Sequence, residues 1–201
     1  MDALQLRDAL AARFDQVITP EVASEILCAA IATPDRSHDV AQFGQQEYRG
    51  VTFQAERLAD VLDELKPLHQ AHFEETEAHH HHLGLDPNYD DMLERERDGR
   101  LIQFTARKDR ELVGHIRMNV LESLHTPSLF ATEEVLYLKP EARSGFTAVR
   151  FIQFVERALE SIGVAEVRTD SKGGSMRLMQ YLGYQPISTK FYKALGAKHV
   201  Q

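Results

Sequence analysis

The sequence predicts an α/β domain with a twisted, mixed sheet that is antiparallel first, parallel later, and flanked by helices. Two observations support this prediction. Apolar runs at residues 101–109 and 111–122 are joined by a short charged turn, which is typical of a β-hairpin. From residue 128 on, strand patterns alternate with helix patterns, and this alternation favours parallel strands. The chain has 201 residues, of which 43% are hydrophobic, so it is long enough to build one sizeable core.

Residues 1–46 are expected to form a helical extension and linker, in front of a main domain that spans residues 47–201. Residues 1–18 carry apolar side chains at nearly helical spacing. A second helix should begin after Thr19, a suitable N-cap, with Pro20 at its first position. The turn-rich stretch 34–50 is typical of a linker. Two short amphipathic helices cannot bury their apolar faces alone, so we expect docking on the domain, on a second copy in a homodimer, or on a larger assembly.

The first half of the main domain should contain one strand, two helices and the hairpin. The strand is expected at 48–56. A long helix should follow at 57–79, interrupted or bent near Pro67 because proline removes a backbone donor. A shorter helix at 88–99 should be closed by Gly99, and the hairpin of residues 101–122 comes next.

The second half should alternate strands and helices. A strand at 128–140 is ended by Pro140, and a broad apolar face predicts an amphipathic helix over 146–164. A short strand at 165–171, a helix at 175–184 stopped by Gly183, and a last strand at 185–195 complete the pattern. In such a sheet, a ligand is expected at the carboxyl ends of the parallel strands.

Charge and composition narrow the class of protein. The net charge of −8 argues against a general nucleic-acid binder, which needs a basic surface. From Arg143 onward, however, there are 9 Lys and Arg against 4 Asp and Glu, which indicates contact with a small polyanion or a chance asymmetry. Cys28 is the only cysteine, so no internal disulfide can form. The absence of a signal-like or long uncharged stretch predicts a non-exported, cytoplasmic protein with no membrane association.

The stretch "KPEARSGFTAVRF", residues 139–151, is the most informative part of the sequence. A proline ends an apolar run, a glycine-bearing turn follows, and an amphipathic helix begins. Backbone N–H groups in such a turn, together with the positive end of the helix dipole, suit a diphosphate. The alternative is a plain turn with a satisfied helix cap.

The stretch "LYLKPEARSGFTAVRFIQFVERALESIGV" and the later "MRLMQYLGY" resemble the GNAT N-acetyltransferase superfamily, and the resemblance covers roughly residues 48–195. It implies the GNAT fold and an acyltransferase that uses acetyl-CoA as co-substrate. Three further stretches, "PDRS…EYRG", "LHQAHFEETE" and "DSK…LMQYLGY", resemble acetyltransferase-like proteins encoded in phages and prophages. That narrower resemblance implies a location in the host cytoplasm or in a virion.

The resemblance also implies which residues hold acetyl-CoA. The backbone of Leu138 would pair with the pantetheine arm, Arg143 matches the family's Arg or Gln, and the turn that lines the pyrophosphate would comprise Ser144, Gly145, Phe146, Thr147 and Ala148. The family usually has glycine where this chain has Phe146. Because a phenylalanine does not easily adopt a positive φ, the turn must bend at Gly145 instead, or hold the phosphates less closely.

The same resemblance implies the acid and base of acetyl transfer. Glu134 lies where family members often carry a general base, and Glu133 should point to the opposite face of the strand. The alternative is that Glu134 is only an exposed carboxylate. The family's usual proton-donating tyrosine is replaced by Met179, which cannot donate a proton, so Tyr181, Tyr192 or solvent would have to protonate the thiolate.

The four histidines His79–His82 raise the question of a metal site, with His69, His72 and nearby carboxylates as further ligands. Adjacent histidines within one turn point in different directions, unlike the i, i+4 pairs of metal-binding helices, so we expect no metal. In the family this segment borders the acceptor pocket. Histidines there, with Asp86 and Tyr89, could contact a polar acceptor or form a solvated helix end.

Two functions follow from these observations. One is an acetyl-CoA-dependent N-acetyltransferase that acts on an amine of a small molecule or a protein. The other is a non-catalytic GNAT-fold binding module or structural component of a phage or virion. The intact strand, turn and helix, with Arg143 and Glu134, favour the enzyme, whereas Met179 and the added N-terminal helices favour the second reading.

Overall fold

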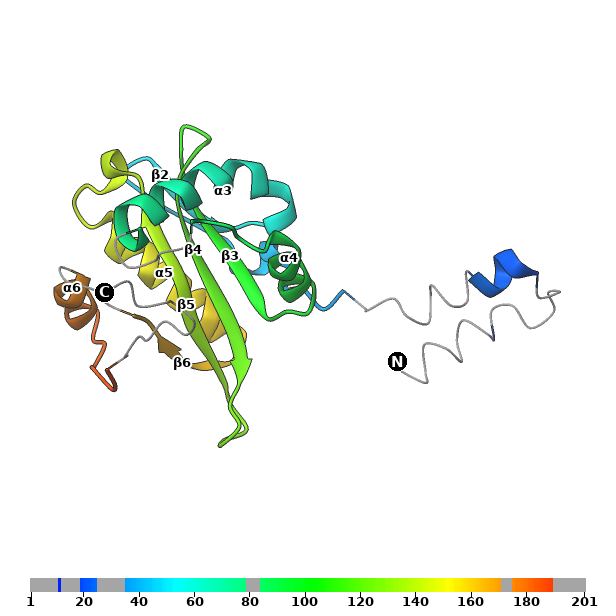
Figure 1. Ribbon diagram of the computed structural model, residues 1–201. Coiled ribbons are helices and arrows are strands. Elements are labelled where there is room, and N and C mark those ends of the chain that lie inside the picture. The colour runs from blue at the N-terminus through cyan, green and yellow to red at the C-terminus, as the bar shows by residue number, and fades with distance from the viewer. Residues whose placement is uncertain (1–10, 12–18, 25–34, 79–83, 171–174, 190–201) are drawn as a thin grey trace, which may run out of the picture.

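The computed structural model describes residue 11 and residues 19–24, 35–78, 84–170 and 175–189. Its centre is one six-stranded sheet in the order β1-β2-β3-β4-β5-β6 (Figure 1). Neighbouring strands are antiparallel from β1 to β5, and β5 pairs with β6 in parallel. The strands are β1 (Gln45–Tyr48), β2 (Val51–Ala55), β3 (Leu101–Lys108), β4 (Glu111–Glu122), β5 (Leu129–Leu138) and β6 (Val164–Arg168). The predicted mixed sheet is confirmed.

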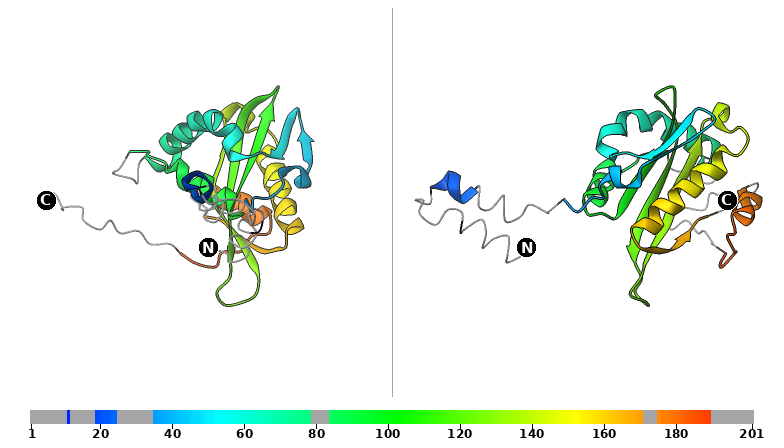
Figure 2. Two further views of the ribbon diagram at one scale, coloured as in Figure 1. Left: turned by 90° about the vertical axis from the view of Figure 1, so that its right-hand side faces the viewer. Right: turned by 180° about the vertical axis from the view of Figure 1, so that it is seen from behind.

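Helices cover both faces of the sheet. Two of them, α3 (Leu58–His72) and α4 (Tyr89–Arg97), lie on one face, and α5 (Thr147–Ser161) lies on the other (Figures 1 and 2). A π-helical segment, η2 (Phe73–Glu77), continues α3, and a short helix, α6 (Ser175–Tyr181), follows β6. Two 3₁₀ turns, η1 (Val40–Phe43) and η3 (Pro140–Ala142), precede β1 and follow β5. Pro67 lies inside α3, and the helix continues through it to His72.

The sheet alternates between two cores. Every second residue of β3 faces α5, where Ile102, Phe104 and Ala106 join the larger core. The predicted apolar face of α5 is buried there, and Phe151 stacks on Phe53 with ring centroids 4.9 Å apart. The smaller core, under α3, is built from Leu58, Val61, Leu65, Leu68, Leu101, Leu112, Val135 and Tyr137.

The prediction of a linker over residues 34–50 is wrong at its C-terminal end, because Gln45–Tyr48 form strand β1. The sequence "QQEY" gives no apolar alternation, so its strand character comes from pairing with β2. Arg49 and Gly50 connect the two strands with φ of 51° and 73°. Two consecutive positive φ values form the compact hairpin turn that fits the twist of a β-ribbon.

The two ends of the chain lie largely outside the described residues. Of the two predicted N-terminal helices, residues 20–24 are helical, and Thr19 caps them through a hydrogen bond from the N–H of Val22 to its hydroxyl (3.3 Å). The prediction of a last strand at 185–195 is wrong for residues 185–189, which form no strand. Pro186, which has no N–H to donate to a ladder, lies within this segment. Residues 190–195 are outside the described part.

Candidate functional site

The second half of β5 has no neighbouring strand on its β6 side among the described residues. Parallel pairing with β6 ends at Thr132 and Arg168, yet β5 continues for six residues to Leu138. No described strand pairs with this last part of β5 on the β6 side. A strand edge of this kind offers alternating N–H and C=O groups to an extended, amide-bearing ligand.

The edge of β5 leads directly into a turn and the N-terminus of α5. Gly145 has φ +59°, while Phe146 has φ −103° and serves as the N-cap residue. The prediction that the turn bends at Gly145 rather than at Phe146 is therefore confirmed. The first N–H groups of a helix lack intrahelical acceptors and carry a positive partial charge, so this turn presents them at the end of the open strand.

The tip of the β1–β2 hairpin lies against the same turn. The hydroxyl oxygen of Tyr48 is 3.5 Å from the N–H nitrogen of Phe146. A Cβ built on Gly145 would lie 2.9 Å from a guanidinium nitrogen of Arg49. The guanidinium of Arg49 thus adds a positive charge to the turn, and within the described part of the chain it forms no ion pair. Sequence reasoning missed both residues because they come from a hairpin almost 100 positions away.

Arg143 lies at the turn, as predicted, but its guanidinium already has partners. Its Nε–H donates to the carbonyl oxygen of Leu138 (2.7 Å), and its two terminal nitrogens donate to the two carboxylate oxygens of Glu75 (2.7 and 2.6 Å). The guanidinium carbon also lies 5.4 Å from the ring centroid of Tyr137. Arg143 therefore reaches back to the carbonyl of Leu138, which the sequence assigned to a pantetheine arm.

The residues that the sequence considered for proton transfer differ in their positions. Met179 is buried at 8% exposure and packs in the larger core. Tyr181 is 67% exposed, and its ring is 6.2 Å from that of Phe146, so it lies at the turn. Glu134 lies four residues before the end of β5, about 13 Å along the strand from Leu138. Tyr192 is outside the described residues.

Under α3, the sheet carries a buried polar cluster that sequence reasoning did not assemble. Gln103 pairs across the strands with Arg117, and Thr105 pairs with His115, so all four face the same side. The Nε–H of Arg117 donates to Glu134 (2.9 Å), and a terminal N–H donates to Nε2 of His69 on α3 (3.2 Å). This cluster lies next to the smaller apolar core.

The hydrogen bonds of the cluster fix the state of His69. A guanidinium can only donate, so Nε2 accepts and the proton must be on Nδ1. That N–H then donates to the hydroxyl of Tyr89 (3.2 Å), which leaves the phenol proton free for another acceptor. Burial and the nearby charge of Arg117 lower the pKa of His69 to about 4, so the ring is neutral at pH 7. Tyr89, an acceptor-side candidate from the sequence, and His69, which the sequence considered only as a further metal ligand, are thus in direct contact.

His115 is the most enclosed member of the cluster. It is fully buried, and its ring centroid is 5.0 Å from that of His69. Burial holds the pKa of His115 well below its usual value. Neither of its ring nitrogens, nor Oε1 of Gln103, has a hydrogen-bond partner in the part of the chain that the structure describes. The sequence does contain a pattern that could have indicated this cluster, because polar residues stand at every second position of two strands joined by a hairpin. The same pattern is typical of a solvent-facing surface.

Glu133 and Glu134 point in different directions, in agreement with the sequence. The β4–β5 register shifts between Arg117 and Met118, so β5 carries one extra residue, Glu134, in a β-bulge. Glu134 turns to Arg117, and its side chain is 40% exposed. Glu133 accepts a hydrogen bond from the hydroxyl of Thr169 (2.6 Å), just beyond the end of β6, and burial raises its pKa. Glu133 is therefore a second carboxyl group near the unpaired part of β5.

The tests for metal and membrane features concern the described residues alone. Among them, no group of three or more His, Cys, Asp or Glu side chains is arranged to hold a metal ion. His79–His82 lie outside them, so their predicted lack of metal stays a prediction. No helix in the described ranges is long and apolar enough to cross a membrane.

Solved structures with the same fold are acetyltransferases. A ribosomal-protein-alanine N-acetyltransferase from Brucella melitensis aligns with a TM-score of 0.60 and 15% identity over 73% of this chain and 98% of its own. A GCN5-related N-acetyltransferase from Ralstonia eutropha aligns with a TM-score of 0.59 and 19% identity over 74% and 100%. The aminoglycoside acetyltransferase AAC(6′)-Iy, solved with a bisubstrate analogue of CoA and acetylneamine, aligns with a TM-score of 0.55 and 16% identity over 72% and 98%.

These comparisons establish the fold: the chain has the α/β fold of GNAT N-acetyltransferases. No protein-family model matches the sequence. No curated protein matches it either, and the narrower resemblance to phage-encoded proteins gains no support. At identities of this size, the comparisons show the fold and not the activity.

Proposed function

We propose that this protein is an N-acetyltransferase that moves the acetyl group of acetyl-CoA to an amine acceptor. One observation carries the proposal: β5 runs past its pairing with β6, and its open edge leads directly into the Gly145 turn at the N-terminus of α5. An extended arm with amide groups matches the strand edge, and a diphosphate matches the N–H groups of the turn. A protein of the same fold has been solved with a bisubstrate analogue of CoA and acetylneamine, which supports a CoA ligand for this fold.

In this proposal the turn residues hold the cofactor, and the cations around the turn balance its charge. Leu138 provides backbone groups for the pantetheine arm. The pyrophosphate lies on the backbone of residues 144–148. Arg49, which has no described carboxylate partner, and Arg143 supply positive charge. The basic excess after Arg143 favours the same polyanionic ligand.

The chemistry needs one proton acceptor and one proton donor. Acetyl-CoA supplies an activated thioester carbonyl, and the acceptor amine forms the new C–N bond as the C–S bond breaks. Glu134 receives the amine proton, most simply through a water molecule, since its carboxylate is partly exposed and held by Arg117. The leaving thiolate takes its proton from Tyr181, Tyr192 or solvent, because the thioether of Met179 has no proton to donate.

The acceptor is a separate question. The neighbours of this fold include an enzyme named for ribosomal-protein alanine and one solved with an aminoglycoside-based analogue. The acceptors that these two names indicate carry a primary amine, either at a peptide terminus or on an amino sugar. An acceptor screen should therefore contain peptides with a free N-terminus and aminoglycosides.

The test has a binding arm and a turnover arm. Acetyl-CoA should raise the melting temperature by mass action, and amine acceptors should release free CoA thiol. Glu134→Gln should lower turnover about 10²-fold or more without changing the affinity for acetyl-CoA, since the turn is untouched. Glu133→Gln is the matched control, because the neighbouring carboxyl faces Thr169 instead. If only Glu133→Gln lowers the rate, the base is Glu133. An unchanged melting temperature at millimolar acetyl-CoA would contradict the proposal.

A second candidate is a GNAT-fold binding protein without turnover, as part of a virion or another assembly. The burial of Met179, where the family's acid is expected, favours it. Binding of acetyl-CoA with no thiol release across the acceptor screen would support this candidate over the enzyme.

A further inference from the structure

The guanidinium of Arg143 is held in a fixed position beside the Gly145 turn. Its Nε–H is bonded to the carbonyl of Leu138, and its planar face lies near the ring of Tyr137. The two terminal nitrogens form a fork, and both carboxylate oxygens of Glu75 fill this fork at 2.6–2.7 Å. A fork of this geometry binds a carboxylate or a phosphate in the same bidentate way. Glu75 therefore occupies the position that a phosphate would need.

Glu75 comes from η2, the π-helical continuation of α3. Single π-helical turns are rare and are frequent at functional sites. The neighbouring Glu74 points elsewhere: its carboxylate accepts a hydrogen bond from Gln70, one turn earlier (2.7 Å). Arg143 lowers the pKa of Glu75, so the carboxylate is charged at pH 7 and neutralises the guanidinium.

The ion pair is easily replaced. The side chains of Arg143 and Glu75 are 39% and 43% exposed. Pairs exposed to this degree add little net stability, because water solvates the separated charges well. A doubly charged diphosphate could exchange with the carboxylate at small cost, whereas a weaker anion would not displace it.

We propose that Glu75 is a built-in competitor for the cofactor, which sets the affinity of the turn for the CoA diphosphate by occupying Arg143 in the ligand-free protein. The inference rests on the proposed function, since it concerns the same turn. Binding of CoA then requires Glu75 to leave Arg143, and η2 is freed from its tether. Because η2 continues α3, which carries His69, the turn and the polar cluster around Arg117 are linked through one helix.

The proposal predicts tighter binding when the competitor is removed. Glu75→Gln leaves Arg143 free and removes a negative charge beside the diphosphate. An exposed ion pair corresponds to a gain of up to about fivefold in CoA affinity. Glu74→Gln removes the same charge from the same segment without touching Arg143, so its affinity should stay near that of the wild type.

The experiment is a calorimetric titration of the full chain with CoA. The variants are Glu75→Gln, Glu74→Gln, Arg143→Ala and the double variant Glu75→Gln with Arg143→Ala. We expect tighter binding for Glu75→Gln alone, weaker binding for Arg143→Ala, and a smaller effect of Glu75→Gln once Arg143 is absent, because only the charge repulsion is then relieved. Both positions are partly exposed, and a melting curve confirms that each variant is folded.

The possible failures are distinguishable. If the wild type and Glu75→Gln bind CoA equally, Glu75 is only a tether for η2 and the inference is wrong, while the proposed function stands. The inference is also wrong if Glu75→Gln weakens binding, or if Glu74→Gln has the same effect as Glu75→Gln. If neither the wild type nor any variant binds CoA, the proposed function fails and the inference fails with it.

Discussion

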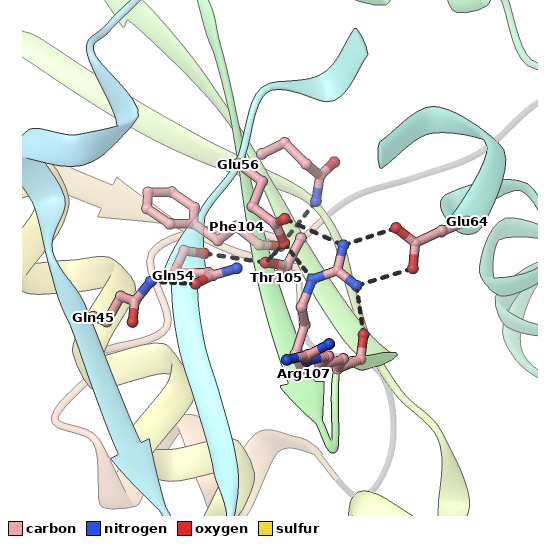
Figure 3. A network of polar contacts seen from close by, with 9 residues as sticks. Gln45, Gln54, Glu56, Glu64, Phe104, Thr105 and Arg107 are labelled. Carbon is pink, nitrogen blue, oxygen red and sulfur yellow. Dashed lines mark hydrogen bonds and ion pairs between the residues drawn. The ribbon is translucent and has the colours of Figure 1, made fainter. Parts of the chain in front are cut away.

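Two arginine networks lie on neighbouring strands, and they differ in how completely their hydrogen bonds are used. Arg107 on β3 lies between two carboxylates, Glu56 and Glu64, as Figure 3 shows. Four contacts of 2.8–3.2 Å join its guanidinium to these groups, and a fifth reaches the carbonyl of Arg110 (2.8 Å). This network ties β3, the start of α3 and the β3–β4 turn together.

Arg117 on β4 is more deeply buried than Arg107 but has fewer hydrogen-bond partners. It bonds one carboxylate, Glu134, which is 40% exposed, and one neutral imidazole, His69. Beside it, Oε1 of Gln103 and both ring nitrogens of His115 have no partner among the described residues.

The difference separates a structural network from a candidate site. Buried polar groups are normally satisfied, and those that are not call for an explanation. The hydrogen-bond donors of Arg107 have acceptors, and two carboxylates neutralise its charge, as expected for a network that stabilises the fold. The Arg117 cluster contains polar atoms without described partners beside the proposed base, as expected where a ligand or a proton must be bound.

The largest expected effect tests this division directly. Arg107→Met would leave Glu56 and Glu64 without their shared cation, and the loss of its hydrogen bonds to two carboxylates should lower the free energy of unfolding by about 3 kcal/mol. Arg117→Met removes fewer bonds and should cost about 2 kcal/mol. Turnover should show the opposite order: Arg107→Met keeps most of it, and Arg117→Met, which releases Glu134, loses most of it. Urea unfolding and thiol release measure the two quantities.

The comparison would break if both variants lost stability and turnover in the same proportion. Arg117 would then be a structural residue like Arg107, and its cluster would not belong to the candidate site.

The sequence predicts the strand, turn and helix around Gly145 well because they are made from contiguous backbone. Pro140, Gly145 and the apolar face of α5 lie within one short stretch, and each has a local conformational consequence. The same local logic placed most strands and helices close to their observed bounds.

The remainder depends on contacts that no local pattern encodes. Gln103 and Arg117 alternate with apolar residues in a way that also fits a solvent face, and only the packing of α3 buries them. Strand β1 has no apolar alternation, and the Glu75–Arg143 pair joins residues 68 positions apart. In each case the tertiary structure determines the outcome, so the sequence alone could not.

A smaller effect uses pH to examine the Arg117 cluster. The pKa of His69 is about 4 in the folded protein, against 6.5 for an unperturbed histidine, so the unfolded chain binds this proton more readily. The stability that neutral His69 contributes is therefore complete above pH 6.5 and is lost as the pH falls from 6.5 toward 4. Between pH 7 and pH 5 the loss amounts to about 2 kcal/mol.

His69→Gln should remove this part of the pH dependence, which urea unfolding at pH 7 and pH 5 would measure. The same substitution at His125, on the exposed turn between β4 and β5, controls for the loss of an imidazole. A pH dependence that is equal in the wild type and His69→Gln would show that His69 is not the titrating group. The evidence that the Arg117 cluster differs from the structural Arg107 network would then be weaker.

The smallest expected effect concerns the Gly145 turn, which belongs to neither arginine network. Gly145 and Gly163, at the two ends of α5, have φ of +59° and +84°, and a left-handed conformation costs an alanine about 1 kcal/mol at either position. A Cβ at Gly145 would also approach Arg49 and Tyr48 at 2.9 and 3.2 Å, whereas one at Gly163 meets nothing within 4 Å. Because Arg49 and Tyr48 would be touched at the mobile ends of their side chains, the two alanine variants should differ in stability by only a few tenths of a kcal/mol. Their response to ligand should differ clearly: acetyl-CoA should still raise the melting temperature of Gly163→Ala, but it should raise that of Gly145→Ala much less. If the two variants respond equally, the diphosphate does not lie on this turn, and the cofactor part of the proposed function is wrong.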